Sequence, residues 1–293
     1  MDGVIVIRKE KDYTSHDVVA KLRGILHMKK IGHTGTLDPQ AEGVLPVALG
    51  KATRLVELLS DKSKTYEAVL RLGVVTDTQD MTGQILETSE EIPQEEVIRE
   101  VIASFLGNQM QVPPMYSALK VNGKKLYELA REGKVVERQA RPVHFSEIEV
   151  LEMNLPFVKI RVSCSKGTYI RTLCHDIGQK LGCGACMESL LRTRVGVFLL
   201  EDALTLAEVE TLMKDGTVEK HILGIEEVLA DYSRLLCPKE ADRLLINGNP
   251  LPGSIFKEDA PKKEVRMCTS DGDFIGLYRW ENRKERYFPV KMF

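Results

Sequence analysis

The alternation of apolar and polar positions predicts both strands and helices along this chain. Residues 64–72 alternate strictly, with Tyr66, Ala68, Leu70 and Leu72 on one side, as in a strand with one buried face. Less regular apolar runs predict further strands over 1–9, 143–152 and 157–164.

Apolar residues three and four positions apart predict the helices. Thr14-Ser15-His16-Asp17 has the pattern of a helix cap and precedes a predicted helix over about 15–28. Pro93 opens a second predicted helix, which Gly107 closes. Further helices are predicted near Thr53, before Gly133, from Gly167-Thr168 onward, and over about 204–215 and 223–230.

The character of the sequence changes after Leu235-Leu236-Cys237-Pro238. Beyond this point, short strand-like runs alternate with turns at Asn247-Gly248-Asn249-Pro250 and Asp271-Gly272-Asp273. We therefore predict two domains, a large one over residues 1–235 and a small β-rich module over 236–293.

Composition limits the class of protein. The chain has 293 residues, of which 43% are hydrophobic, enough for a sizeable core. No apolar run approaches the ~20 residues that span a bilayer. The N-terminal apolar run precedes its positive charges, whereas a signal peptide has them first. Six cysteines in a chain of this length favour free thiols. We expect a cytoplasmic protein that does not bind membranes.

Charge is segregated along the chain although the net charge is only −2. Residues 120–141 contain seven Lys or Arg against three Glu, whereas residues 200–231 contain nine Asp or Glu against two Lys. Such segregation leaves a basic face that can bind a polyanion, although solvated helix faces would give the same pattern.

The segment Gly32-His33-Thr34-Gly35-Thr36-Leu37-Asp38-Pro39 is the strongest candidate for a functional loop. Its glycines permit close approach of a ligand, and Pro39 pushes Asp38 towards an extended conformation. Ordering such a loop costs conformational entropy, which favours a binding role. The alternative is a polar turn whose aspartate caps a helix.

Three other motifs match known sites poorly. Gly50-Lys51 lacks the glycine spacing and the following Ser or Thr of a phosphate-binding P-loop. Gly182-Cys183-Gly184 begins a dinucleotide fingerprint, but Met187 replaces its third glycine. Cys183 and Cys186, near Cys174 and His175, lack a second pair at zinc-finger spacing. We therefore predict no metal site.

Several separated motifs together resemble the TruB family of pseudouridine synthases. They are the loop 32–39, Gly50-Lys-Ala-Thr-Arg54, Lys64-Thr-Tyr66, Gln111-Val-Pro-Pro-Met-Tyr-Ser-Ala-Leu-Lys120, Gly167-Thr-Tyr-Ile-Arg171-Thr and Leu190-Leu-Arg192. The resemblance implies an α/β fold of the α+β type, with helices flanking a mixed, largely antiparallel sheet. It also implies a small C-terminal module similar to the RNA-binding PUA domain.

The resemblance implies an enzyme that isomerises uridine 55 in the T loop of tRNA to pseudouridine. Asp38 would act as nucleophile or base, Arg171 would orient it, and Tyr66 would stack on the extruded base. The substrate-binding residues carried over, together with those of a basic RNA-clasping insertion near 108–141, are His33, Lys9, Leu190, Gly35, Thr36, Lys120, Lys124 and Lys125. Arg283, Lys284 and Arg286 could contact RNA from the small module.

Two other functions fit the same residues. One is an RNA-binding folding chaperone with secondary catalysis, and the other is a guide-RNA-directed enzyme of the same superfamily. The resemblance favours a monomer that requires no cofactor and no obligatory protein partner, with the T arm of tRNA as its substrate.

Overall fold

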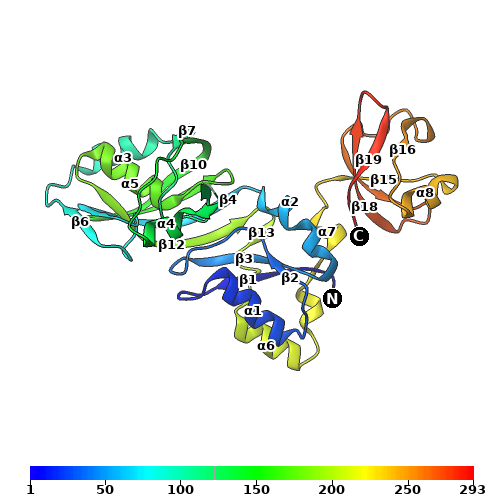
Figure 1. Ribbon diagram of the computed structural model, residues 1–293, viewed down its shortest axis with the longest axis horizontal. Helices are drawn as coiled ribbons and strands as arrows, with labels where there is room; N and C mark the ends of the chain where they lie inside the picture. Colours follow the sequence, from blue (N-terminus) through cyan, green and yellow to red (C-terminus); the bar gives the residue numbers. More distant parts are fainter. Residues whose placement is uncertain (122) are drawn as a thin grey trace.

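The computed structural model describes residues 1–121 and 123–293 of the chain. Figure 1 shows an elongated molecule in which a long curved sheet carries helices at both ends and a small β-rich module lies at one extremity. The two chain termini lie near the junction with this module.

The elements follow each other in a mixed α/β order. The strands of the large domain are β1 (Gly3–Lys9), β2 (Ile31–His33), β3 (Glu42–Leu49), β4 (Lys64–Leu72), β5 (Val74–Thr76), β6 (Ile85–Thr88), β7 (Gly107–Gln111), β8 (Lys120–Val121), β9 (Lys124–Lys125), β10 (Arg141–Asn154), β11 (Phe157–Cys164), β12 (Ala185–Val195), β13 (Phe198–Leu199) and β14 (Leu223–Gly224). The small module contains β15 (Ser233–Leu236), β16 (Leu251–Pro252), β17 (Glu264–Cys268), β18 (Phe274–Glu281) and β19 (Arg286–Met292).

The helices are short. The α-helices are α1 (Ser15–Ile25), α2 (Val56–Ser60), α3 (Glu95–Ala103), α4 (Leu126–Arg131), α5 (Ile170–Leu181), α6 (Leu206–Lys214), α7 (Ile225–Val228) and α8 (Asp242–Ile246). Four 3₁₀ turns accompany them: η1 (Gly50–Leu55), η2 (Val218–His221), η3 (Lys239–Ala241) and η4 (Gly253–Ile255).

The large sheet confirms the predicted fold class. It has ten strands, eight of them in the order β14-β1-β3-β12-β4-β11-β10-β7, with β13 on β12 and β2 on β3. Its pairs are antiparallel except β3 with β12, where Glu42 faces Leu191 and Gly43 faces Arg192. This parallel contact brings two distant segments of the chain to the middle of the sheet.

Strand β4 covers the predicted range of 64–72, and its burial alternates as the sequence pattern requires. Tyr66, Ala68, Leu70 and Leu72 are buried, together with Lys64 at the strand's first position. Because β4 lies between β11 and β12, this buried face is central to the sheet. It forms one core with the apolar face of α5.

The predicted helices are present with shifted ends. Helix α1 starts at Ser15 with the expected cap, since Thr14 Oγ1 accepts from the backbone N–H of Asp17 at 3.1 Å. It ends at Ile25, earlier than the predicted position 28. The helix predicted after Pro93 covers Glu95–Ala103, and Gly107 begins strand β7.

The small module is a five-stranded sheet in the order β15-β17-β18-β19-β16. It already includes Ser233, three residues ahead of the predicted boundary. Its last residues pack back on the large domain, where Arg54 Nη1 donates to the carbonyl of Met292 at 2.6 Å. Phe293 stacks on Phe274 and joins the core beneath α2.

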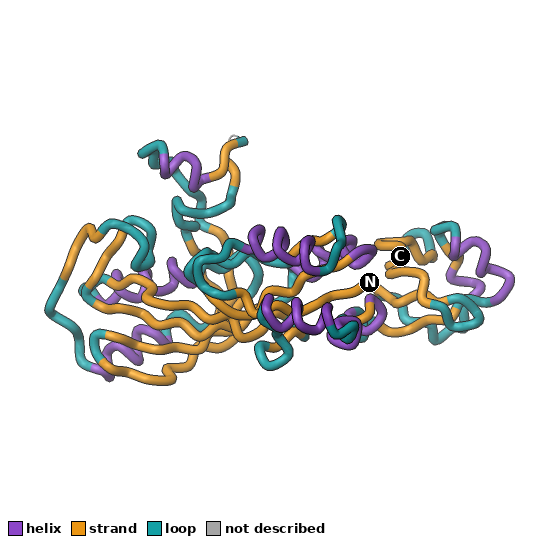
Figure 2. The backbone as a smooth tube through the Cα atoms, turned by 90° about the horizontal axis from the view of Figure 1, so that it is seen from below, coloured by secondary structure: helices purple, strands orange, loops and turns teal. Residues whose placement is uncertain are grey.

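The basic segment near 108–141 includes the β8–β9 hairpin and helix α4. Figure 2 shows a segment with a short helix and paired strands that projects from the body of the large domain. The Tyr127 N–H bonds to Ser117 O, and Arg138 Nη1 donates to Pro113 O. These contacts connect the projecting segment to residues that reach the sheet.

The structure also describes the cysteines, the groups that could bind a metal and the helices that could cross a membrane. All six cysteines are buried and free. Within residues 1–121 and 123–293, no three His, Cys, Asp or Glu side chains form a group that could hold a metal ion. In the same residues, no helix combines the length and the apolar character that crossing a membrane requires.

Gly43, at the parallel contact of β3 with β12, gives a test of this architecture. Its φ is +105°, and a Cβ there would overlap the backbone of Arg192. We expect Gly43→Ala to lower the free energy of unfolding by about 3 kcal/mol, through strain and the forced separation of the two strands. Urea denaturation measures this loss.

Gly216→Ala is the matched control, because Gly216 also has a positive φ (+68°) but open space around it. It should cost only about 1 kcal/mol. Equal losses at the two positions would show that the close contact at Gly43 does not matter.

Candidate active site

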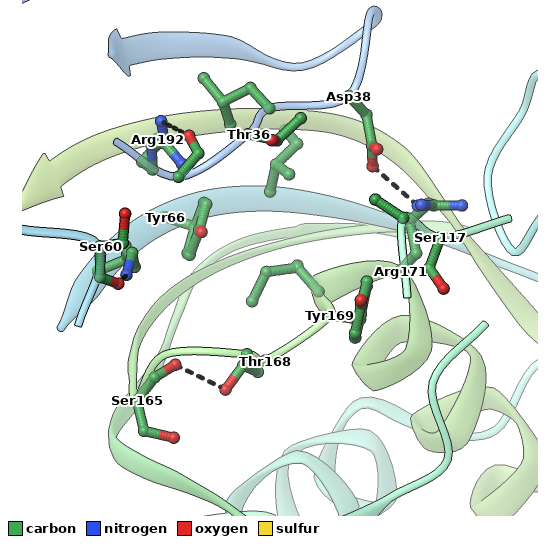
Figure 3. Close-up of a pocket in the computed structure, with 17 residues that line it drawn as sticks. Thr36, Asp38, Ser60, Tyr66, Ser117, Ser165, Thr168, Tyr169, Arg171 and Arg192 are labelled. Atoms are coloured by element: carbon green, nitrogen blue, oxygen red, sulfur yellow. Dashed lines mark hydrogen bonds and ion pairs between the residues drawn. The ribbon is translucent and has the colours of Figure 1, made fainter. Parts of the chain in front are cut away.

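A cavity of about 300 Å³ opens over the middle of the large sheet. Its walls come from the loop after β2, from β4 and β12, from the start of α5 and from the segment around Ser117. In Figure 3, Asp38 and Arg171 point toward one another on one side of Tyr66, and Ser60 and Arg192 lie on the other side.

The Asp38 loop is held by contacts along its length. The Ser15 hydroxyl accepts from the backbone N–H of Leu37 at 3.0 Å, and Leu37 itself is buried. Arg192 Nη2 donates to the carbonyl of Gly35 at 3.0 Å. Lys9 Nζ donates to the carbonyl of Pro39, also at 3.0 Å. The protein therefore fixes the backbone on both sides of Asp38 before any substrate binds.

Asp38 forms an ion pair rather than a helix cap. Its Oδ2 lies 2.9 Å from Nε of Arg171, whose side chain is only 6% exposed, whereas the Asp38 side chain is 43% exposed. A buried cation therefore orients a carboxylate that still reaches the cavity. This arrangement suits a carboxylate that acts on a bound molecule.

Arg171 is the point where four segments meet. Besides Asp38, its Nε lies 3.6 Å from Oδ2 of Asp80. Its Nη1 donates to the carbonyl of Thr78 at 3.0 Å and its Nη2 to the carbonyl of Tyr116 at 2.8 Å. The guanidinium thus joins the Asp38 loop, the turn after β5, the projecting segment and helix α5.

The Asp80 carboxylate is itself held in place. Its Oδ1 accepts from the Thr78 hydroxyl at 2.7 Å and from the backbone N–H of Thr82 at 3.0 Å. Helix α5 also contacts this turn, since the Thr172 hydroxyl donates to Gln79 Oε1 at 2.8 Å. Asp80 is therefore a fixed second counter-charge for Arg171.

An aromatic and aliphatic wall crosses the cavity between its two charged sides. Tyr66 and Leu190 are nearly buried and line the cavity on adjacent strands, together with Tyr169 and Ile170 from the start of α5. Burial raises the pKa of the Tyr66 hydroxyl, so it stays protonated near neutrality. Such a wall accepts a planar ring.

Two cations line the other side of the cavity. Lys64 is 7% exposed and Arg192 is 1% exposed, and a Cβ placed on Gly35 would lie 3.7 Å and 3.6 Å from their side chains. Burial, reinforced by Arg192, lowers the pKa of Lys64 to about 8. Gly35 and Thr36 line the same cavity, and their role in substrate binding remains a prediction.

Lys9 and His33 lie beside the cavity and not in its lining. Lys9 is fully buried and bonded to two backbone carbonyls, of Glu10 and Pro39. In this structure Lys9 therefore supports the backbone of the Asp38 loop, and its contact with the substrate remains a prediction. The His33 ring packs edge-on against His16, and burial lowers its pKa to about 4, so it is neutral at pH 7.

The predicted RNA-clasping lysines lie on the projecting segment and are not among the residues that line the cavity. Lys120 is exposed on β8. On β9, Lys124 lies 3.4 Å from the Glu132 carboxylate and Lys125 donates to the Tyr127 hydroxyl at 3.2 Å. They can supply charge to a large ligand, and their contact with RNA remains a prediction.

Five residues that line or adjoin the cavity were not among the predicted site residues: Asp80, Lys64, Arg192, Tyr169 and Ser117. Lys64 and Arg192 were present in the motifs as flanking residues only. Asp80 follows Asp77-Thr78-Gln79, a polar turn with the same mixture of carboxylate and hydroxyl groups as the Asp38 loop. That composition is the one signal that could have found it.

Family models match most of the large domain. Residues 23–170 match the TruB family pseudouridylate synthase N-terminal domain. Residues 171–230 match the tRNA pseudouridylate synthase B C-terminal domain. The chain belongs to the TruB family of pseudouridine synthases.

Two relatives illustrate the TruB similarity. The tRNA pseudouridine synthase B of Lachnoclostridium phytofermentans is 48% identical, with 100% of each chain covered. That of Bacillus pumilus is also 48% identical, with 100% of this chain and 97% of the relative covered. As a member of this family, the chain is an isomerase.

Solved structures support the fold over nearly the whole TruB chain. A Cbf5-Nop10-Gar1 complex contains a chain that is 31% identical, with a TM-score of 0.75. An H/ACA RNP bound to a substrate RNA containing 2'-deoxyuridine contains one that is 28% identical, also with a TM-score of 0.75. In both cases 99% of this chain and 84% of the other are covered.

The contacts of Arg171 predict a large structural effect. We expect Arg171→Met to lower the free energy of unfolding by about 3 kcal/mol, because Asp80 and two carbonyls would lose their charged partner. Urea denaturation measures the change.

Arg161→Met is the control, since Arg161 also pairs with two carboxylates, of Glu67 and Glu149, but on an exposed face of the sheet. It should change stability by less than about 1 kcal/mol. If the two variants lost the same stability, burial of the Arg171 network would not matter.

Proposed function

We propose that this protein isomerises uridine 55 in the T loop of tRNA to pseudouridine, with Asp38 as the reacting carboxylate. One observation carries the assignment of roles: a partly exposed carboxylate, paired with a buried guanidinium, faces a cavity with an aromatic wall.

The proposed reaction requires few groups other than this carboxylate and this cavity. The N1–C1′ bond of uridine breaks, the uracil turns, and C5 bonds to C1′. The proton on C5 is lost and N1 gains one, so no net oxidation or hydrolysis occurs. A carboxylate that acts as nucleophile or base at the sugar or the ring starts this sequence. Asp38 has the required exposure, and Arg171 holds it in position.

The base must leave its stack to reach this carboxylate. Unstacking costs a few kcal/mol, which an enzyme offsets with new stacking contacts. Tyr66 supplies a ring for stacking, and Leu190 on the neighbouring strand supplies an apolar surface. The Tyr66 hydroxyl, protonated because burial raises its pKa, is available to donate a hydrogen bond.

Two observations favour a tRNA enzyme over a guide-directed one. The tRNA pseudouridine synthases are 48% identical and 97–100% covered, whereas the chain from the H/ACA RNP is 28% identical and 84% covered. Loops of RNA are recognised through shape and splayed bases. The exposed basic residues of the projecting segment suit such a contact with an RNA loop. We also propose that the enzyme requires no protein partner.

Asp38→Asn tests the catalytic role. We expect it to bind T-arm RNA with unchanged affinity and to form pseudouridine at least about a thousandfold more slowly, because the amide is no nucleophile or base. Tritium release from an RNA labelled at uracil C5 measures the reaction, and filter binding measures the affinity.

Asp215→Asn, an exposed change at the end of α6, is the control and should behave as wild type. Activity of Asp38→Asn near the wild-type rate would contradict the assignment. The assay uses the purified chain alone on an unmodified T-arm stem-loop, so that a guide-dependent enzyme would show no reaction.

A further inference from the structure

Lys64 and Arg192, the two cations on the Ser60 side of the cavity, are buried charges without a paired carboxylate among the described residues. Arg192 is fully buried, and Lys64 is nearly so. Burying a charge is costly unless an opposite charge accompanies it. Yet within residues 1–121 and 123–293, neither side chain has a carboxylate within ion-pair distance. The acid of the adjoining turn, Asp61, is paired with Lys166 at 2.8 Å.

Backbone carbonyls hold both cations but do not neutralise them. Lys64 Nζ donates to the carbonyls of Ser60 and Lys62 at 2.6 and 2.7 Å. Since an ammonium has three donors, one remains for a ligand. Arg192 donates through Nε to Val44 O and through Nη2 to Gly35 O, and its guanidinium also lies against the Tyr66 hydroxyl.

The groups around Lys64 favour an anion from the RNA backbone. Ser60, Ser165 and Thr168 also line the cavity (Figure 3). The Ser60 and Thr168 hydroxyls donate to the carbonyls of Val56 and Ser165, whereas among the described residues the Ser165 hydroxyl keeps its proton for a ligand. Lys166, between Ser165 and Gly167, is exposed at this rim. The uracil ring is neutral and fits the Tyr66 wall, whereas a phosphate provides the full negative charge that two buried cations lack.

We propose that Lys64, beside Arg192, binds a phosphate of the RNA backbone next to the uridine that enters the cavity. The inference rests on the proposed function for the identity of that nucleotide. It assigns Lys64 to substrate binding and Arg192 to positioning, since Arg192 also holds the Gly35 carbonyl. The protein thus keeps an uncompensated charge that its substrate neutralises.

A binding cycle between protein and RNA tests the site. T-arm stem-loops carry one neutral methylphosphonate, either directly 5′ or directly 3′ of the target uridine, or in the stem as a control. Wild-type protein should bind one of the two flanking RNAs about tenfold more weakly than unmodified RNA, as expected for one charge-assisted contact. The stem substitution should have a smaller effect.

Lys64→Met should bind unmodified RNA about tenfold more weakly than wild type does. Its affinity should not fall further with the methylphosphonate RNA that weakens wild-type binding. Its binding should depend less on salt, by about 0.7 in the logarithmic slope. Thermal denaturation checks that the variant is folded, because Lys64→Met also removes the donor to the carbonyls of Ser60 and Lys62. Lys214→Met, on the exposed face of α6, is the control variant.

The proposal would be overturned if Lys64→Met and the methylphosphonate each weakened RNA binding and the two losses added in the combination. It would also be overturned if wild-type protein bound both flanking methylphosphonate RNAs with full affinity. The second result needs only wild-type protein and so does not depend on the folding of a variant. Because the readout is affinity, the outcome is separate from catalysis: absence of pseudouridine from every RNA would refute the proposed function and leave the binding cycle interpretable.

Discussion

The buried guanidinium of Arg171 is the interaction on which the site depends. Three segments from distant parts of the sequence contact it, through the carboxylates of Asp38 and Asp80 and the carbonyls of Thr78 and Tyr116. A buried cation is stable only when such partners surround it. The requirement to satisfy one charge therefore brings the Asp38 loop, the projecting segment and helix α5 into a fixed arrangement.

The centre of the sheet imposes the second constraint. The parallel contact of β3 with β12 places Arg192 under the Asp38 loop, where it holds the carbonyl of Gly35. Lys9 and Lys64 are buried around the same loop and bonded to backbone carbonyls. Burial, and to a smaller extent the charge of Arg192, lowers the pKa of both lysines to about 8. The concentration of positive charge around the loop suits a polyanion.

Local patterns predicted much of this structure. Strict alternation identified β4, and the Thr14 cap identified the start of α1, because both depend on neighbouring residues alone. Strand β12 was not predicted, since two register irregularities break its pattern. The contacts of Asp80 and Lys9 were also missed, because they depend on partners 91 and 30 positions away, Arg171 and Pro39. The family resemblance supplied Asp38, Tyr66 and Arg171, which periodicity could not.

The single-turnover rate of Arg171→Met on saturating T-arm RNA tests the central claim most directly, that Arg171 makes Asp38 a competent catalyst. We expect a rate at least about a hundredfold below wild type, with RNA affinity within about threefold, because a positioned carboxylate loses its partner but the RNA loses no contact. The rate refers to the folded fraction, measured by denaturation. A wild-type rate in this variant would contradict the account.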